Sequence, residues 1–128
     1  MPSQVRILFE KGEVTATLDD SATAEAIRRA LPFEGVVNRW GDEIYFSIPV
    51  HVVETPDARQ QMSVGELGYW PIGAAFCIFF GPTPMSRGDE IRPASEVTVF
   101  GKLEGDPKVF KKVSSGAKVV IERAGEQA

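Results

Sequence analysis

The chain has 128 residues, of which 43% are hydrophobic and 25% are charged, proportions typical of one globular domain rather than of a disordered segment. Its formal net charge of -4 argues against a nucleic acid or an anionic membrane as a partner bound through bulk electrostatics. The single cysteine excludes an intramolecular disulfide, and no signal-peptide pattern follows Met1. We therefore expect a single cytoplasmic domain over residues 1–128, with disorder only in the last few residues.

The first part of the chain predicts a β-hairpin followed by a helix. Two short runs of alternating apolar residues, 4–9 and 14–18, flank a turn at Gly12. Residues 19–21 then supply the side chains that cap a helix N-terminus. The helix is expected to end at Pro32, because proline disfavours the helical conformation in the residue before it.

The middle of the chain predicts extended structure. Residues 35–53 are expected to form strands around a turn at 41–42, and Pro49 indicates an edge position or a bulge there. The polar segment 55–61 is expected to be a connection. Strand-like composition returns over 62–70.

An apolar run without any charge, residues 74–80, is the strongest pattern in the chain. It is too short for a membrane span, which needs about 20 residues, and turn residues flank it on both sides. This pattern is typical of a strand buried on both faces or lining a filled barrel. The segment 81–93 follows with three prolines and two glycines, which predicts a long surface loop of the kind that often carries function.

The last part of the chain predicts a strand over 96–103, a short helix over 106–113 and a final strand over 118–123. The final strand is expected to pair with the first. About eight strands with two helices between them predict a mainly β fold. A closed eight-stranded barrel fits this count, because a barrel of that size is filled by its own side chains.

Three motifs resemble the cyclophilin family. They are GELGYW at 65–70, GAAFCI at 73–78 and VFGKL at 99–103, which are similar to the cyclophilin patterns GxLSMA, GSQFFI and VFGKV. When segments 38–46 and 79–84 are also considered, the chain resembles small prokaryotic cyclophilin-like proteins of uncharacterised function more than it resembles cyclophilins themselves. This resemblance covers nearly the whole length and implies a compact cyclophilin-like β-barrel.

The resemblance implies an isomerase site that is mostly missing here. Cyclophilins polarise the substrate amide with an arginine beside a hydrophobic proline pocket, and the motif that carries this arginine is absent. Arg39 is the nearest arginine in chain order. The motifs place the other pocket residues of cyclophilins, in this sequence, at Ala75, Cys77, Val97 and near Arg92. We therefore expect no efficient prolyl isomerase activity.

Polar and aromatic residues are densest over 39–45. The guanidinium of Arg39 beside the indole of Trp40 suits an anionic or planar ligand, whereas the alternative is a solvated hairpin turn whose tryptophan covers one barrel end. The proline-rich loop with Thr83 suits a preformed binding rim, but equally a plain connection. Trp70 and Phe76 are predicted either to form the walls of a pocket or to belong to the core. Aromatic residues on strands are more often core residues.

The single cysteine and the single histidine predict no catalytic pair. Cys77 lies in an apolar run, which predicts a buried and inert thiol. His51 alternates with valines, which predicts a surface-facing strand residue. No metal-ligand spacing and no phosphate-binding glycine loop is found, so neither a metal nor a cofactor is expected.

These observations predict a binding module for a small molecule or an extended peptide, in a groove between the 39–45 turn and the 81–92 loop. Two alternatives stay open, a weak or altered prolyl isomerase that uses Arg39 and a protein-protein interaction domain. Oligomeric state stays open as well. The candidate ligand-binding residues are Arg39, Trp40, Glu43, Tyr45, Trp70, Phe76, Thr83 and Arg92.

Overall fold

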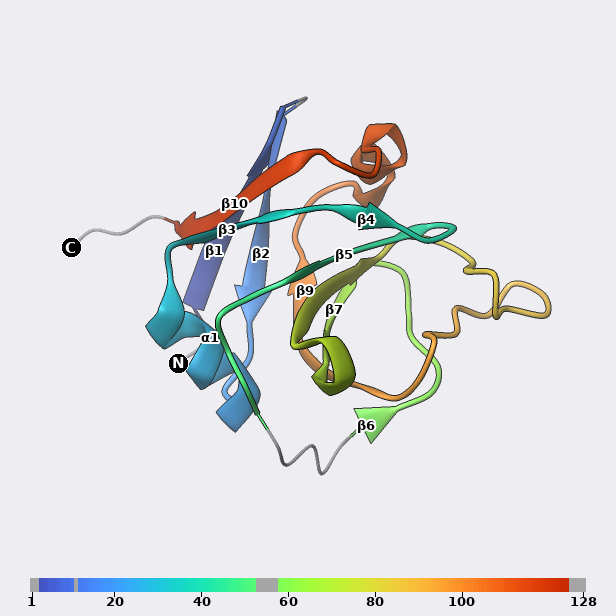
Figure 1. Cartoon of the computed structure of the whole chain (residues 1–128), viewed down its shortest axis with the longest axis horizontal. Coiled ribbons are helices and arrows are strands. Elements are labelled where there is room, and N and C mark those ends of the chain that lie inside the picture. Colours follow the sequence, from blue (N-terminus) through green and yellow to red (C-terminus); the bar gives the residue numbers. More distant parts are fainter. Residues whose placement is uncertain (1–2, 11, 53–57, 125–128) are drawn as a thin grey trace.

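The chain folds into a nearly closed antiparallel β-barrel (Figure 1). The computed structural model describes residues 3–10, 12–52 and 58–124. The strand order around the sheet is β3-β10-β1-β2-β9-β7-β8-β5-β4, and β6 pairs with β9 outside this path. The strands are β1 Ser3–Phe9, β2 Gly12–Leu18, β3 Phe33–Val36, β4 Asn38–Arg39, β5 Glu43–Ser47, β6 Ala58–Arg59, β7 Glu66–Trp70, β8 Ala75–Phe79, β9 Val97–Leu103 and β10 Lys118–Arg123.

The two ends of the sheet are consecutive in the chain, and this closes the barrel. β3 pairs with β10 and β4 pairs with β5, while Val37 alone separates β3 from β4. The Val37 amide donates to the carbonyl of Ala117 (2.8 Å) at the junction. If β3 and β4 are counted as one strand and the two-residue β6 is left out, the ring has eight strands. The predicted mainly β, eight-stranded barrel is confirmed, and so is the pairing of β10 with β1.

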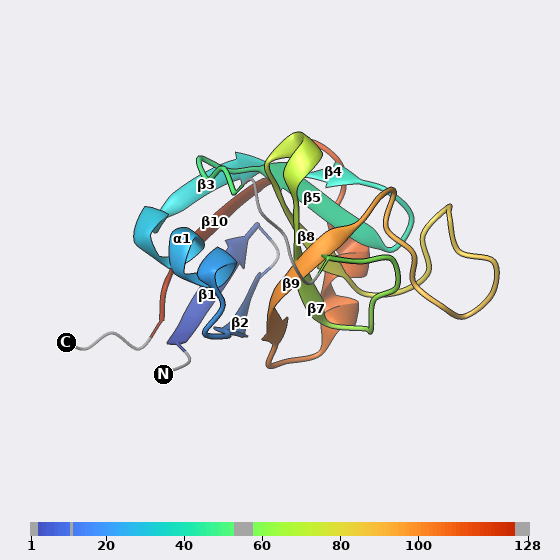
Figure 2. The same cartoon turned by 90° about the horizontal axis from the view of Figure 1, so that it is seen from below.

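One α-helix and two 3-10 helices lie between the strands of the described part of the chain. The helix α1, Ala22–Ala30, begins after Ser21, whose side chain accepts a hydrogen bond from the amide of Ala24 (3.1 Å). Figure 2 shows it beside β1, β2 and β3, on the opposite side of the barrel from the 81–92 loop. The 3-10 helix η2, Pro107–Lys112, begins after Asp106, and a short 3-10 turn η1, Pro71–Gly73, joins β7 to β8.

Strand β8 is buried on both faces, as the apolar run predicted. Phe76 and Ile78 point into the main core, where the Phe76 ring stacks on that of Phe46 with centroids 5.0 Å apart. The alternate residues Cys77 and Phe79 point outward into a second, smaller apolar cluster. This second cluster makes β8 the shared wall of two layers, because successive side chains of a strand point to opposite faces.

Several predicted boundaries were wrong. β5 ends at Ser47, so Pro49 is not inside a strand, and His51 is exposed as predicted but is not part of a strand. The strand predicted over 62–70 begins only at Glu66, with an isolated bridge from Met62 to Ile91 before it. Residues 53–57 and 125–128, which include part of the predicted connection and the predicted disordered end, lie outside the described residues. No helix in the described ranges is long and apolar enough to span a membrane.

Candidate functional site

A tight turn between β4 and β5 sets the position of the candidate site. Trp40 and Glu43 exchange backbone hydrogen bonds of 2.9 and 3.2 Å across this turn. Gly41 has a positive φ of 64°, and a Cβ there would lie 2.7 Å from Cδ of Pro84. Glycine therefore allows both the turn conformation and the close approach of the 81–84 loop. The Asp42 amide, which donates to the carbonyl of Pro82 (3.0 Å), ties the loop to the turn.

Alternation along β5 sends Glu43 and Tyr45 to the outer face of the barrel. The residue between them, Ile44, points into the main core with Phe46. Glu43 is nevertheless only 5% exposed, and its Oε1 atom has no hydrogen-bond partner. A buried polar atom without a protein partner is rare in folded proteins and indicates strain, a functional role, or a bound water, ion or ligand.

The aromatic pocket is a small cavity of about 140 Å³ above this carboxyl, on the outer face of the sheet. Two of its walls, the rings of Tyr45 and Trp70, have centroids 5.9 Å apart and meet at 76°. The indole nitrogen of Trp70 donates to Oγ of Ser95 (2.5 Å), which holds the ring in place. The residues that line the pocket are Trp40, Glu43, Tyr45, Trp70, Pro93, Ala94 and Val97.

Burial controls the protonation of the two titratable groups beneath the pocket. It raises the pKa of Glu43 to about 8, against 4.5 for an ordinary glutamate, and the Cys77 thiol opposes this to a smaller extent. The pKa of Cys77 is raised well above its usual value, first by burial and then by the neighbouring Glu43 carboxylate. Cys77 donates a long hydrogen bond to the carbonyl of Ala75 (3.9 Å). At neutral pH Glu43 is therefore mostly a neutral acid and Cys77 a neutral thiol.

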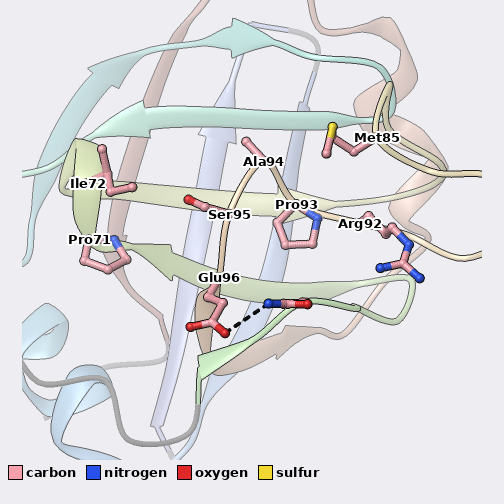
Figure 3. A pocket seen from close by; sticks show the side chains of 9 residues that line it. Pro71, Ile72, Met85, Arg92, Pro93, Ala94, Ser95 and Glu96 are labelled. Atoms are coloured by element: carbon pink, nitrogen blue, oxygen red, sulfur yellow. Dashed lines mark hydrogen bonds between the residues drawn. The ribbon is translucent and has the colours of Figure 1, made fainter.

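The broad groove is a wider depression of about 590 Å³ next to the aromatic pocket (Figure 3). The two share Pro93 and Ala94, so the extended segment before β9 borders both. Among the residues of the groove, Oε2 of Glu96 accepts a hydrogen bond from Nε2 of Gln60 (3.2 Å). The residues that line the groove are Gln60, Pro71, Ile72, Met85, Arg92, Pro93, Ala94, Ser95 and Glu96.

Comparison with known proteins shows the family of this chain. A family model described as cyclophilin-like matches residues 3–122. The chain belongs to the cyclophilin-like family. This cyclophilin-like protein is similar to a hypothetical protein from Archaeoglobus fulgidus whose solution structure is known: the two are 40% identical, the match covers 96% of this chain and 95% of the other, and the TM-score is 0.82. No curated protein matches the sequence.

Half of the predicted ligand-binding residues of this cyclophilin-like barrel come together in the aromatic pocket. Trp40, Glu43, Tyr45 and Trp70 all line it, although they come from the turn, from β5 and from β7. The pairing of β5 with β8 and of β8 with β7 brings these elements side by side.

Arg39 lies elsewhere and is held within the protein. Its guanidinium donates to the carbonyls of Gly41 (2.5 Å), Lys111 (3.1 Å) and Val113 (3.0 Å). It also pairs with the Asp42 carboxylate (3.1 Å) and lies 5.0 Å above the Phe80 ring. These contacts fasten the β4–β5 turn to the end of η2, and Arg39 does not line the aromatic pocket.

The other three candidates are distributed over the core and the loop. Phe76 is fully buried in the main core of this cyclophilin-like barrel. Thr83 is buried within the 81–92 loop, where its hydroxyl donates to the carbonyl of Arg92 and accepts from the amide of Met85 (3.2 Å). Arg92 lines the broad groove, and its Nε donates to Oε2 of Glu90 (3.0 Å).

The candidate ligand-binding residues do not include three residues of the aromatic pocket, Pro93, Ala94 and Val97, although the cyclophilin motifs place a pocket position at Val97. Val97 lies on β9 next to β7, and the other two precede that strand. Their side chains are small or apolar, so only the motif resemblance at Val97 could have pointed to any of them. A loop that returns across the outer face of a sheet can be identified only from the fold.

Proposed function

We propose that this barrel is a binding module that takes a small molecule, or one side chain of an extended peptide, into the aromatic pocket. The observation that carries the proposal is the Glu43 carboxyl, which is 5% exposed, lines a cavity with aromatic walls and leaves Oε1 unpartnered. Burying a carboxyl without a full set of partners is unfavourable. A cavity in which a perturbed titratable group meets apolar walls is a typical binding site.

The sizes of the two depressions support a ligand with a small head group and a longer remainder. Pockets that hold drug-sized ligands have volumes of roughly 300–1,000 Å³, whereas the volume of the aromatic pocket is about 140 Å³. The adjoining broad groove offers about 590 Å³ and has Ile72 and Met85 on its rim, with exposures of 77% and 52%. We infer that the head group enters the aromatic pocket and the remainder lies across Pro93 and Ala94.

Intrinsic fluorescence provides a direct test, because both tryptophans of the chain line the aromatic pocket. We expect that members of a mixed library of neutral, anionic and cationic fragments and short peptides will change this fluorescence saturably. Trp40→Leu removes one aromatic wall, keeps Trp70 as the reporter, and should weaken each hit by roughly tenfold or more, since such walls dominate binding in small pockets.

The matched control for this screen is Val36→Ala, a change at a residue that is 61% exposed on β3 and does not line either depression. It should bind every hit as the unmodified protein does. Hits that bind Trp40→Leu with unchanged affinity, or a library without any hit, would contradict the proposal.

We further infer that the barrel is not an efficient prolyl isomerase. The guanidinium of Arg39 already donates to three backbone carbonyls, so it is not available to polarise a substrate amide. In a protease-coupled assay on Ala-Pro peptides, we expect the uncatalysed rate both for the unmodified protein and for Arg39→Ala. An acceleration that Arg39→Ala abolishes, while circular dichroism shows it to be folded, would instead establish an isomerase with a relocated arginine.

A further inference from the structure

We propose that the head group bound in the aromatic pocket is an organic cation, an alkylammonium or a methylated ammonium. This inference rests on the proposed binding function and specifies its ligand class. It follows from three features together: the aromatic lining of the pocket, the buried acceptor Glu43, and a lining that, among the described residues, includes no lysine or arginine.

Three aromatic side chains line the cavity, from the β4–β5 turn, from β5 and from β7. The rings of Tyr45 and Trp70 meet at 76°, which places two walls nearly at right angles, and Trp40 contributes a third aromatic side chain. The face of an aromatic ring carries partial negative charge, so several faces around one point attract a cation. Methylated ammonium groups suit such enclosures, because they are charged and at the same time apolar in shape.

Glu43, which is 5% exposed, supplies the negative charge that an organic cation needs in the aromatic pocket. Its unpartnered Oε1 can accept a hydrogen bond from a primary ammonium or lie against a methylated one. A nearby positive charge favours the ionised form of a carboxyl. With a pKa of about 8, ionisation at pH 7 is disfavoured by only about tenfold, which a bound cation can readily overcome.

The charged and titratable groups around Glu43 do not oppose this assignment. β8 contributes Cys77, a neutral thiol at neutral pH, and β5 itself contributes Tyr45. β7 contributes Trp70, and β9 with the segment before it contributes Val97 and two further uncharged residues, Pro93 and Ala94. Within the described part of the chain, no lysine or arginine lines the pocket. An anionic head group would therefore meet a carboxyl and aromatic faces without any balancing charge.

Choline and its uncharged isostere 3,3-dimethyl-1-butanol separate the effect of charge from that of shape. The probe cation has the same charge at every pH, so any pH dependence of its binding reports groups of the protein. In a fluorescence titration at about pH 8, we expect choline to bind at least ~10-fold more tightly than the isostere. Choline binding should also be ~10-fold or more tighter at about pH 8 than at about pH 6, because Glu43 must be ionised.

Glu43→Gln is the variant that tests the role of the carboxyl. Glutamine has nearly the shape of the protonated acid, so the variant should fold and should bind the neutral isostere as before. It should lose the preference for choline and its pH dependence. A peptide with one trimethyl-lysine should bind more tightly than the free amino acid if the natural ligand is a peptide, and no more tightly if it is a small amine.

The outcomes separate this inference from the proposed function. If the isostere binds as well as choline, or if Glu43→Gln keeps the preference for choline, the cation assignment is wrong. If neither probe binds while neutral or anionic fragments do, the ligand class is wrong and the binding function stands. If no probe and no fragment binds, both proposals fail.

Discussion

Glu43→Gln is expected to stabilise the protein by up to about 5 kcal/mol at pH 8 and to change its stability little near pH 4.5. The pKa of Glu43 is about 8 in the folded protein, against 4.5 for an ordinary glutamate. One unit of pKa difference between the folded and unfolded states corresponds to about 1.4 kcal/mol. The effect originates in burial, which disfavours the charged carboxylate.

The sign of the pH dependence follows from proton binding. Between pH 4.5 and about 8 the folded protein holds a proton on Glu43 that the unfolded chain has lost. The free energy of unfolding of the unmodified protein therefore falls as the pH rises through this range, and the contribution of Glu43 levels off above it. Glutamine has no proton to lose, so this contribution is absent from the variant.

Urea denaturation at several pH values between about 5 and about 8 measures this difference directly. Glu34→Gln is the matched control, because it removes a carboxylate whose side chain is 59% exposed. The control should follow the pH profile of the unmodified protein. Parallel profiles for the unmodified protein and Glu43→Gln would show that Glu43 titrates alike in the folded and unfolded states, contrary to our expectation.

The expected stabilisation by Glu43→Gln indicates that Glu43 has a functional rather than a structural role. A residue that lowers the stability of its own fold above pH 4.5 is poorly explained by packing, since a neutral isostere would serve the fold better. Groups that reduce stability in this way are characteristic of functional sites. The expected destabilisation by Glu43 involves no ligand, and it supports the proposal that the aromatic pocket is the site.

Phe76→Ala is expected to lower the free energy of unfolding by about 3–5 kcal/mol, the usual range for deleting a buried phenylalanine ring. Phe76 is fully buried, and its ring lies within 5.0 Å of the Phe46 and Phe100 rings and 6.4 Å from that of Phe33, measured between centroids. The cavity left behind would lie in the centre of the barrel, where neighbouring strands cannot collapse to fill it.

Thermal and urea denaturation of Phe76→Ala test this second expectation, with Val36→Ala as the control. Val36 is 61% exposed on β3, so its truncation should change the unfolding free energy by less than about 0.5 kcal/mol. A loss below about 1 kcal/mol for Phe76→Ala would mean that the core tolerates the cavity. It would also reopen the interpretation of Phe76 as a pocket residue.

Local pattern was sufficient for much of the fold. The apolar run at 74–80 predicted the doubly buried β8, because a strand with apolar residues at every position can be satisfied only by packing on both faces. The capping residue Ser21 marked the start of α1 for an equally local reason. Boundaries were less well predicted where pairing partners decide them. β5, for example, ends at Ser47, the last residue that pairs with β8, and so stops before Pro49.

The sequence by itself determined the barrel, its two-faced central strand and the concentration of polar and aromatic residues near 39–45. Only the tertiary structure decided their roles. Arg39 and Glu43 lie four residues apart, yet the first donates to carbonyls at the end of η2 and the second is buried beside the aromatic pocket. The partners of Arg39 at Lys111 and Val113 and the residues that bury Glu43 come from segments distant in the chain, and no local pattern encodes how those segments meet.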